Sequence, residues 1–206
     1  MPHRAAILLL ALLPALAGAE MPSSLVPQVR IETSLGAFVL EVDTVRAPLS
    51  TENFLRYVRD GYYDGTVFHR VIPNFVVQGG GYDAGLAERK ASAPIANESG
   101  NGLSNRRGTV GLARESSPHS GSSQFYINLV DNTALDPLPS RWGYAVFGRV
   151  VEGMELVDRI AHMATETVPG FGADVPVERP AIKRAWVIEA APADQPPPAT
   201  EAPGPE

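Results

Sequence analysis

One arginine stands in a stretch of sequence that is otherwise rich in apolar residues and glycine. Residues 68–80 read Phe-His-Arg-Val-Ile-Pro-Asn-Phe-Val-Val-Gln-Gly-Gly, with the arginine at position 70. If this stretch is a strand, Phe68, Arg70 and Ile72 share one face. A guanidinium stays charged and holds a planar fork of donors, so Arg70 could stabilise charge that develops in a reaction. The simpler interpretation is an arginine on a solvated face, or one that pairs with a distant carboxylate.

The other candidate groups argue against several familiar kinds of site. The chain has no cysteine, which excludes disulfides, thiolate metal sites and thiol nucleophiles. His69, His119 and His162 lie far apart, without the spacing of a zinc site, so no metal is expected. The serines of residues 120–123 lie outside any G-x-S-x-G motif. The glycines match neither of the nucleotide-binding patterns G-x-G-x-x-G and G-x-x-x-x-G-K-[ST]. We therefore expect no cofactor.

Short apolar runs broken by glycine and proline predict a mainly β fold. Alternation of Val29, Ile31 and Thr33 predicts a hairpin over 28–42 that turns at Gly36. Apolar stripes predict two helices, over 48–60 and 152–161. Further strands are predicted over 66–72, 75–78, 109–113, 124–130, 144–150 and 182–189. We expect a closed eight-stranded antiparallel β-barrel capped by two α-helices, because closure leaves no strand edge exposed.

The two ends differ in composition from the middle. Residues 1–19 place Arg4 before an apolar run and end in Ala-Gly-Ala, which is typical of a secretory signal peptide cut after Ala19. The run is too short for a membrane anchor, which needs about 20 apolar residues. Residues 20–27 are predicted to lead into a single domain over 28–189. Residues 190–206, rich in proline, alanine and acid, are predicted to be a disordered tail.

These features set expectations for location and partners. The signal peptide predicts an exported protein, either periplasmic or secreted, with no membrane insertion after cleavage. The net charge of −6 makes the chain a poor match for phosphate backbones, so no nucleic acid is expected.

Three motifs resemble those of cyclophilin-type peptidyl-prolyl isomerases. The first is the stretch over 68–80. The second joins Gly-Thr-Val-Gly-Leu-Ala-Arg at 108–114 to Gly-Ser-Ser-Gln-Phe-Tyr-Ile-Asn at 121–128, and the third joins Leu135 and Asp136 to Tyr-Ala-Val-Phe-Gly-Arg-Val at 144–150. Order and spacing also match, over residues 29–189. The spacing between Asn128 and Phe147 resembles the bacterial secreted branch of the family.

The resemblance implies an active groove on the outer surface of the barrel. Arg70 falls on the family's catalytic arginine. The proline pocket is implied at Phe75, Val76, Tyr126 and Leu135, and polar contacts to the substrate chain at Gln78, Gln124 and the backbone of Ala113 and Arg114. This sequence departs from the pattern of many members at Arg114, Tyr126 and Tyr144, with Tyr144 also expected to contact substrate. Ala134 replaces a tryptophan that contributes to cyclosporin binding, so weak inhibition is expected.

The implied activity is rotation about X–Pro peptide bonds, which breaks no bond and needs neither nucleophile nor metal. We expect the protein to act as a monomer on proline-containing peptides and unfolded exported proteins. One alternative is a chaperone module that grips proline segments without significant turnover. Another is a lipocalin-like barrel that holds a small apolar ligand, but an arginine within a strand and long polar loops disfavour it.

Overall fold

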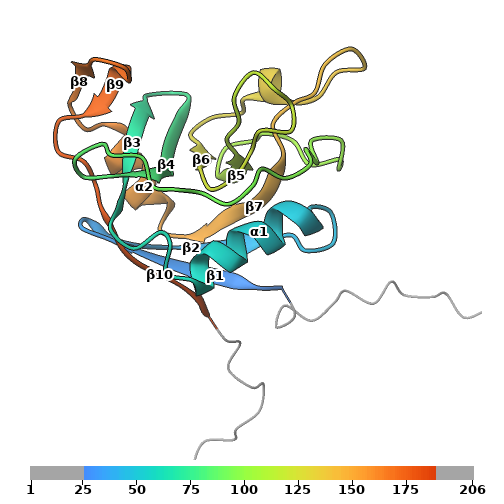
Figure 1. The fold of residues 1–206 in the computed structure, drawn as a ribbon, viewed down its shortest axis with the longest axis horizontal. Helices are drawn as coiled ribbons and strands as arrows, with labels where there is room; N and C mark the ends of the chain where they lie inside the picture. The colour runs from blue at the N-terminus through green and yellow to red at the C-terminus, as the bar shows by residue number, and fades with distance from the viewer. Residues whose placement is uncertain (1–25, 189–206) are drawn as a thin grey trace, which may run out of the picture.

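The computed structural model describes residues 26–188, which form a curled β-sheet with two α-helices (Figure 1). In chain order the elements are β1 (Gln28–Thr33), β2 (Gly36–Val42), α1 (Pro48–Arg59), β3 (Thr66–Ile72), β4 (Val76–Asp83), β5 (Thr109–Leu112), β6 (Phe125–Asn128), the short 3-10 helix η2 (Thr133–Leu135), β7 (Val146–Glu152), α2 (Met154–Ala161), β8 (Thr165–Val168), β9 (Gly172–Pro176) and β10 (Ile182–Ile188).

The predicted strands and helices are all present, with bounds that shift by one or two residues and with two larger differences. β4 continues through the three glycines to Asp83 instead of ending at Gln78. A hairpin of β8 and β9 follows α2, where no strand was predicted. The glycines serve a packing purpose, because a Cβ on Gly80 would lie 2.8 Å from the ring of Tyr63 and the backbone there has a φ of +84°.

Eight strands form one antiparallel sheet in the order β10-β1-β2-β7-β5-β6-β4-β3. The sheet curls until its end strands approach each other, but the seam holds only one bridge, between Val67 and Ala181. There the amide of Phe68 donates to the Pro180 carbonyl at 3.0 Å. Pro180 has no N–H with which to return a bond, so the ladder cannot extend on that side. The barrel is therefore nearly closed, where the sequence led us to expect full closure.

Aromatic side chains fill the interior between the sheet and α1. The ring of Phe54 on α1 lies 5.4 Å from Tyr63, 5.6 Å from Phe125 and 5.2 Å from Phe147. All four residues are at most 1% exposed. Burial of such large side chains stabilises the fold by about 1.5–3 kcal/mol each. On α2, the buried apolar residues are Leu156, Val157, Ile160 and Ala161.

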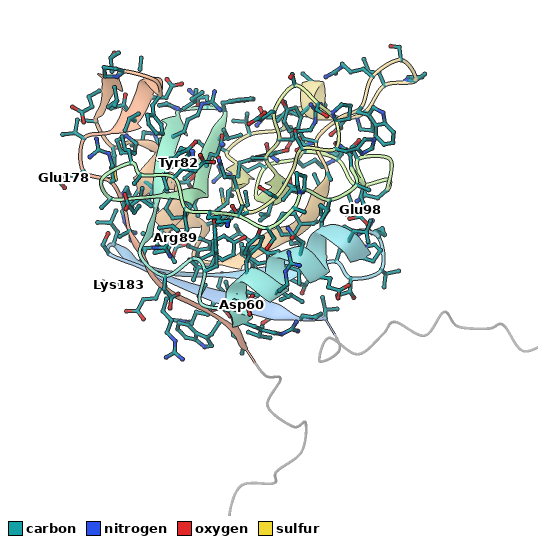
Figure 2. All side chains as sticks on the ribbon, in the orientation of Figure 1. Asp60, Tyr82, Arg89, Glu98, Glu178 and Lys183 are labelled. Carbon is teal, nitrogen blue, oxygen red and sulfur yellow. The ribbon has the colours of Figure 1, made fainter. Side chains whose placement is uncertain are left out.

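The N-terminus of α1 is held by an acid from a distant loop. Pro48 occupies the first turn, and no side chain of the helix itself caps it. The Glu98 carboxylate instead accepts the amides of Leu49 and Ser50 at 2.9 and 2.7 Å, and Figure 2 places Glu98 beside this end of the helix. A negative charge here satisfies free N–H groups and complements the helix dipole. The contact anchors the long loop between β4 and β5.

Two regions of the prediction lie outside the described residues. The expected signal peptide over 1–19 and the expected tail over 190–206 are both among them. Among residues 26–188, no helix is long and apolar enough to cross a membrane. In the same range, no three histidine, aspartate or glutamate side chains gather in a way that could hold a metal ion.

Candidate functional site

Nine of the ten predicted site residues surround one hollow of about 190 Å³. They come from β3, β4, β6, the end of β5, η2 and the approach to β7. We call this hollow the Arg70 pocket, and its lining residues are Arg70, Phe75, Val76, Gln78, Ala113, Arg114, Tyr126, Leu135 and Tyr144. The tenth residue, Gln124, does not line the hollow but hydrogen-bonds to Gln78.

A shift of register turns Arg70 out of the barrel. The pairing of β3 with β4 is irregular between Phe68 and Arg70. Phe68 is fully buried in the core, whereas the Arg70 side chain is 38% exposed and lines the pocket. The expectation from strict alternation, that these two residues share a face, is therefore wrong. Such an irregularity re-aims a side chain without ending the strand.

Two glutamines orient the Arg70 guanidinium. Arg70 pairs with Gln78 across the β3–β4 ladder, and its Nη1 donates to Gln78 Oε1 at 3.3 Å. The Gln78 amide is fixed in turn, because its Nε2 donates to Gln124 Oε1 at 2.9 Å. These two neutral partners orient the guanidinium without neutralising its positive charge.

One carboxylate also approaches the fork, from the hairpin that sequence reasoning missed. Arg70 Nε lies 3.7 Å from Asp174 Oδ2 on β9. Both side chains are more than a third exposed, so the pair is screened by water and is worth about 1 kcal/mol or less. Arg70 is thus not clamped by a buried acid. The Asp174 contact follows from the hairpin, whose Val-Pro-Gly turn at 168–170 was the only signal in the sequence.

Tyr126 forms a buried and closely packed part of the pocket wall. It lies opposite Gly111 on β5, and a Cβ at Gly111 would come within 2.3 Å of the phenol ring. The ring therefore packs directly on the glycine backbone. Its hydroxyl donates to Asn105 Oδ1 at 2.6 Å, and burial raises the pKa of Tyr126 well above its usual value. The extra hydroxyl relative to phenylalanine is used inside the protein and does not face the pocket.

Another part of the pocket wall is held together by Arg114. Its guanidinium lies 4.3 Å from the centre of the Tyr144 ring, in cation–π contact. Its nitrogens also donate to the carbonyls of Gly143, Glu115 and Trp142 at 3.1, 2.8 and 3.0 Å. Arg114 thus ties the loop after β5 to the segment that leads into β7.

Asp136 fixes the other end of that segment. Burial tends to raise the pKa of Asp136, but hydrogen bonds outweigh it and the pKa is lowered. The donors are the Ser104 hydroxyl at 2.5 Å, the Asn105 backbone amide at 2.7 Å and the Asn105 side-chain amide at 2.9 Å. Asn105 therefore supports both Asp136 and Tyr126, a positioning role that sequence reasoning missed.

His69, next to Arg70 in sequence, is buried but does not belong to the hydrophobic core. It is 4% exposed and its Nδ1 has no hydrogen-bond partner. Burial lowers the pKa of His69 to about 4. Its ring contacts the edges of Tyr82 and Phe171, at 4.7 and 6.4 Å between ring centres. The imidazole is therefore neutral at neutral pH.

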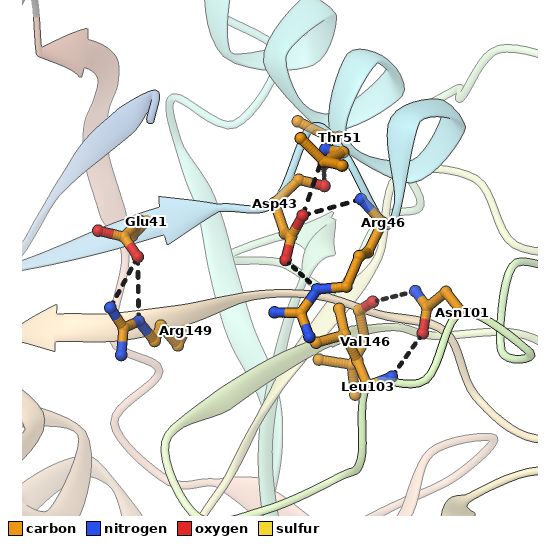
Figure 3. A network of polar contacts seen from close by, with 9 residues as sticks. Glu41, Asp43, Arg46, Thr51, Asn101, Leu103, Val146 and Arg149 are labelled. Atoms are coloured by element: carbon orange, nitrogen blue, oxygen red, sulfur yellow. Dashed lines mark hydrogen bonds and ion pairs between the residues drawn. The ribbon is translucent and has the colours of Figure 1, made fainter. Parts of the chain in front are cut away.

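A larger hollow, of about 370 Å³, lies beside β2 and β7. Its charged side chains already pair with one another (Figure 3): Arg46 contacts Asp43 at 2.7 Å, and Arg149 contacts Glu41 at 2.8 Å. None of the predicted site residues lies there. Size alone therefore does not identify the functional site.

Comparison with known families settles which group of proteins the chain resembles. The family described as cyclophilin type peptidyl-prolyl cis-trans isomerase/CLD matches residues 28–187. This protein belongs to that family. The match covers nearly all of the described residues, including every residue of the Arg70 pocket.

Bacterial cyclophilins are among its relatives. A peptidyl-prolyl cis-trans isomerase of Acinetobacter baylyi is 48% identical over 148 residues, which is 72% of this chain and 78% of that protein. Isomerase cyp18 of Streptomyces antibioticus is 47% identical, over 78% of this chain and 98% of that protein. Isomerase B of Escherichia coli K12 is 43% identical, over 78% and 99%.

Solved cyclophilin structures share the fold. A cyclophilin-type isomerase of Cryptosporidium parvum superposes with a TM-score of 0.63 at 26% identity, covering 79% of this chain and 98% of that one. A second crystal structure of the same isomerase was solved in the presence of the dipeptide Ala-Pro, with a TM-score of 0.63.

Proposed function

We propose that this protein is a peptidyl-prolyl cis-trans isomerase that turns X–Pro bonds in the Arg70 pocket, with Arg70 as the catalytic residue. One observation carries the proposal. The Arg70 guanidinium is oriented by Gln78 and is not paired with a buried acid, and it lies beside a hollow lined by Phe75, Val76 and Leu135. The names of relatives at 43–48% identity agree with this activity.

The chemistry of the reaction matches these residues. A peptide bond resists rotation by about 18–20 kcal/mol because of its partial double-bond character. In the twisted state the proline nitrogen becomes pyramidal and regains a lone pair. The Arg70 guanidinium can donate a hydrogen bond to that lone pair and to neither planar isomer, so it stabilises the transition state selectively. Each ~1.4 kcal/mol of such stabilisation gives a tenfold faster reaction.

The rest of the pocket holds the substrate while the bond turns. Phe75, Val76, Tyr126 and Leu135 enclose the proline ring, so that rotation is confined to one bond. Gln78, Gln124 and the backbone of Ala113 and Arg114 supply polar contacts to the chain on either side of the proline, and the Tyr144 ring closes the remaining wall. Exclusion of water by these apolar walls strengthens the contact between arginine and nitrogen.

The Arg70→Ala variant tests this proposal. Loss of a preorganised donor costs about 10²–10³ in rate, so kcat/KM on an Ala-Pro peptide should fall by that order. The rate can be followed by protease-coupled assay or by NMR exchange. Peptide binding should survive in the variant. If wild-type protein binds the peptide without accelerating its isomerisation, the alternative of a binding module without turnover is correct.

We further propose that the protein works outside the cytoplasm, as a member of the bacterial secreted branch, and assists exported proteins whose folding waits on proline isomerisation. Without a catalyst, proline isomerisation takes tens of seconds. The sequence of residues 1–19 supports export. N-terminal sequencing of the protein from the periplasm or medium should begin at Glu20, and sedimentation should give a monomer. Retention of residues 1–19 in a cytoplasmic fraction would refute export.

A further inference from the structure

A short loop projects from the rim of the Arg70 pocket. Residues 137–143, here called the finger, connect η2 to β7 and extend away from the body of the domain (Figure 1). Two residues that line the pocket, Leu135 and Tyr144, flank the finger on either side. They are joined by a bond from the Tyr144 amide to the Leu135 carbonyl at 2.9 Å. The finger is therefore continuous with the site.

The finger presents two large apolar side chains to solvent. Leu138 is 56% exposed and Trp142 is 46% exposed. A third hollow, of about 380 Å³, lies along this loop, between the finger on one side and Ser99 and Gly100 on the other. The Trp142 ring is steadied by the edge of His119, at 5.2 Å between ring centres. Exposed apolar groups gathered beside a groove are typical of an interaction surface.

Hydrogen bonds hold the backbone of the finger in place. Leu138 and Arg141 exchange two backbone bonds of 2.9 and 3.0 Å across the tip. Arg141 Nη2 donates to the carbonyl of Ala134 at 2.9 Å. At the base, the Gly143 amide donates to Ser99 Oγ at 3.0 Å and Arg114 donates to the Trp142 carbonyl. A surface that is already ordered loses little conformational entropy when a partner binds.

The finger lies within reach of a substrate whose proline sits in the pocket. Leu138 is three residues from Leu135, and an extended chain advances about 3.3 Å per residue. Leu138 therefore stands within about 10 Å of the pocket rim. An extended substrate covers the same distance in about three residues.

We propose that the finger is a second substrate subsite, which takes one large apolar side chain about three residues from the proline. The partner is an unfolded polypeptide, in which such side chains are exposed. A second copy of this chain is a poorer occupant, because a stable dimer buries about 1,200–2,000 Å² and the finger offers only two large apolar side chains. This inference rests on the proposed function, since it assumes that the Arg70 pocket holds proline.

Matched peptides test the inference. The probes are ten-residue peptides with one Ala-Pro, otherwise Gly and Ser, carrying a single Leu at one to six residues from the proline on either side. For wild-type protein, kcat/KM should be about tenfold higher when Leu stands three residues away than for the all-polar peptide. The double variant L138S/W142S should reduce this ratio to near one, with the all-polar peptide turned over at the wild-type rate.

Two further measurements keep the test decisive. Val45→Ser is the matched control, because Val45 is 78% exposed and lies outside the finger, so the ratio should stay at its wild-type value. In a Trp186→Phe background, Trp142 is the remaining tryptophan, and its fluorescence should respond to the Leu peptide only. Thermal unfolding of each variant checks that the fold is intact.

Several results would overturn the inference. The first is a ratio of kcat/KM, Leu peptide over all-polar peptide, that does not depend on the position of Leu. The second is a ratio that stays the same in L138S/W142S. The third is a dimer of the wild-type protein that the double variant disrupts. Failure of the proposed function is distinguishable, because wild-type protein would then leave every peptide unaccelerated. The preference for Leu can still be measured in that case, as a difference in Kd.

Discussion

Arg70 and Gln78 face each other across the β3–β4 ladder, and their side chains meet at 3.3 Å. The Gln78 amide is oriented by Gln124 at 2.9 Å, so residues of two neighbouring strands and a distant loop are joined by hydrogen bonds. A neutral partner fixes the direction of the guanidinium without neutralising it. A carboxylate at position 78 would compete with the substrate for the same donors.

Replacement of Gln78 should therefore slow turnover more than it weakens binding. We expect Gln78→Ala to lower kcat roughly tenfold, which corresponds to about 1.4 kcal/mol. KM should change less, because the apolar walls of the pocket remain. Gln28→Ala, a glutamine on β1 away from the pocket, should leave both constants unchanged. Wild-type kcat in Gln78→Ala would show that Arg70 needs no such partner.

Substitution of Gly111 should disturb the pocket through Tyr126. A Cβ at Gly111 would lie 2.3 Å from the phenol ring, so the ring must move. We expect Gly111→Ala to reduce the free energy of unfolding by about 1–3 kcal/mol in urea titrations and to raise KM. Gly100→Ala is the control, since a Cβ there meets no atom within 4 Å. Equal effects of the two changes would contradict this account.

Removal of the Tyr126 hydroxyl should cost stability and spare activity. The hydroxyl donates to Asn105 at 2.6 Å, and Asn105 Oδ1 also accepts from Asn128 at 3.2 Å, so it keeps a donor in the variant. We expect Tyr126→Phe to lower the free energy of unfolding by about 1 kcal/mol, with kcat/KM near the wild-type value. Tyr126→Ala, which also removes the ring, should lose most activity. A large loss of activity in Tyr126→Phe would mean that the hydroxyl contacts the substrate.

Stability and activity should respond differently to acid. The pKa of buried His69 is about 4 in the folded state, against about 6.5 when unfolded. Between these values the unfolded state binds a proton that the folded state excludes. The contribution of His69 to the free energy of unfolding is therefore fully present above pH 6.5. It is lost as the pH falls toward 4, by about 3 kcal/mol in all. The pKa values of Asp43 and Asp136 are lowered, so protonation of these two residues reduces the free energy of unfolding only in stronger acid.

Urea titrations from pH 4 to 8 measure this slope. His69→Phe, placed among aromatic neighbours that tolerate a ring, should abolish the part of it that belongs to His69. Turnover should stay nearly constant from pH 6 to 9, because arginine does not titrate in this range. A bell-shaped rate profile that tracks a histidine would instead assign that residue a part in the reaction.

Local patterns in the sequence predict most of the fold. The β1–β2 hairpin follows from strict alternation, and α1 from its apolar stripe behind Pro48. The β8–β9 hairpin was missed because its strands are short and mostly exposed, so they carry no apolar alternation. β4 was cut short because glycine usually ends a strand, whereas these glycines make room for Tyr63 and other side chains.

The site could be predicted only in part, for a physical reason. The residues named from the three motifs do gather around one hollow, because the motifs lie on neighbouring strands of the sheet. Their supports, such as Asn105 and Asp174, lie far away in sequence and are ordinary polar residues. The outward turn of Arg70 depends on a shift of register between β3 and β4, which alternation within one strand cannot reveal.

The strand that carries Arg70 is also the last of the eight, and among residues 26–188 only one bridge, from Val67 to Ala181, joins it to the segment that leads into β10. A border of this kind can recruit neighbouring molecules as additional strands. β9 packs against β3, so the β8–β9 hairpin shields this strand from neighbouring molecules. A shortened version of the protein without residues 165–176 would therefore be prone to self-association at high concentration, even though every residue of the Arg70 pocket would remain in its sequence.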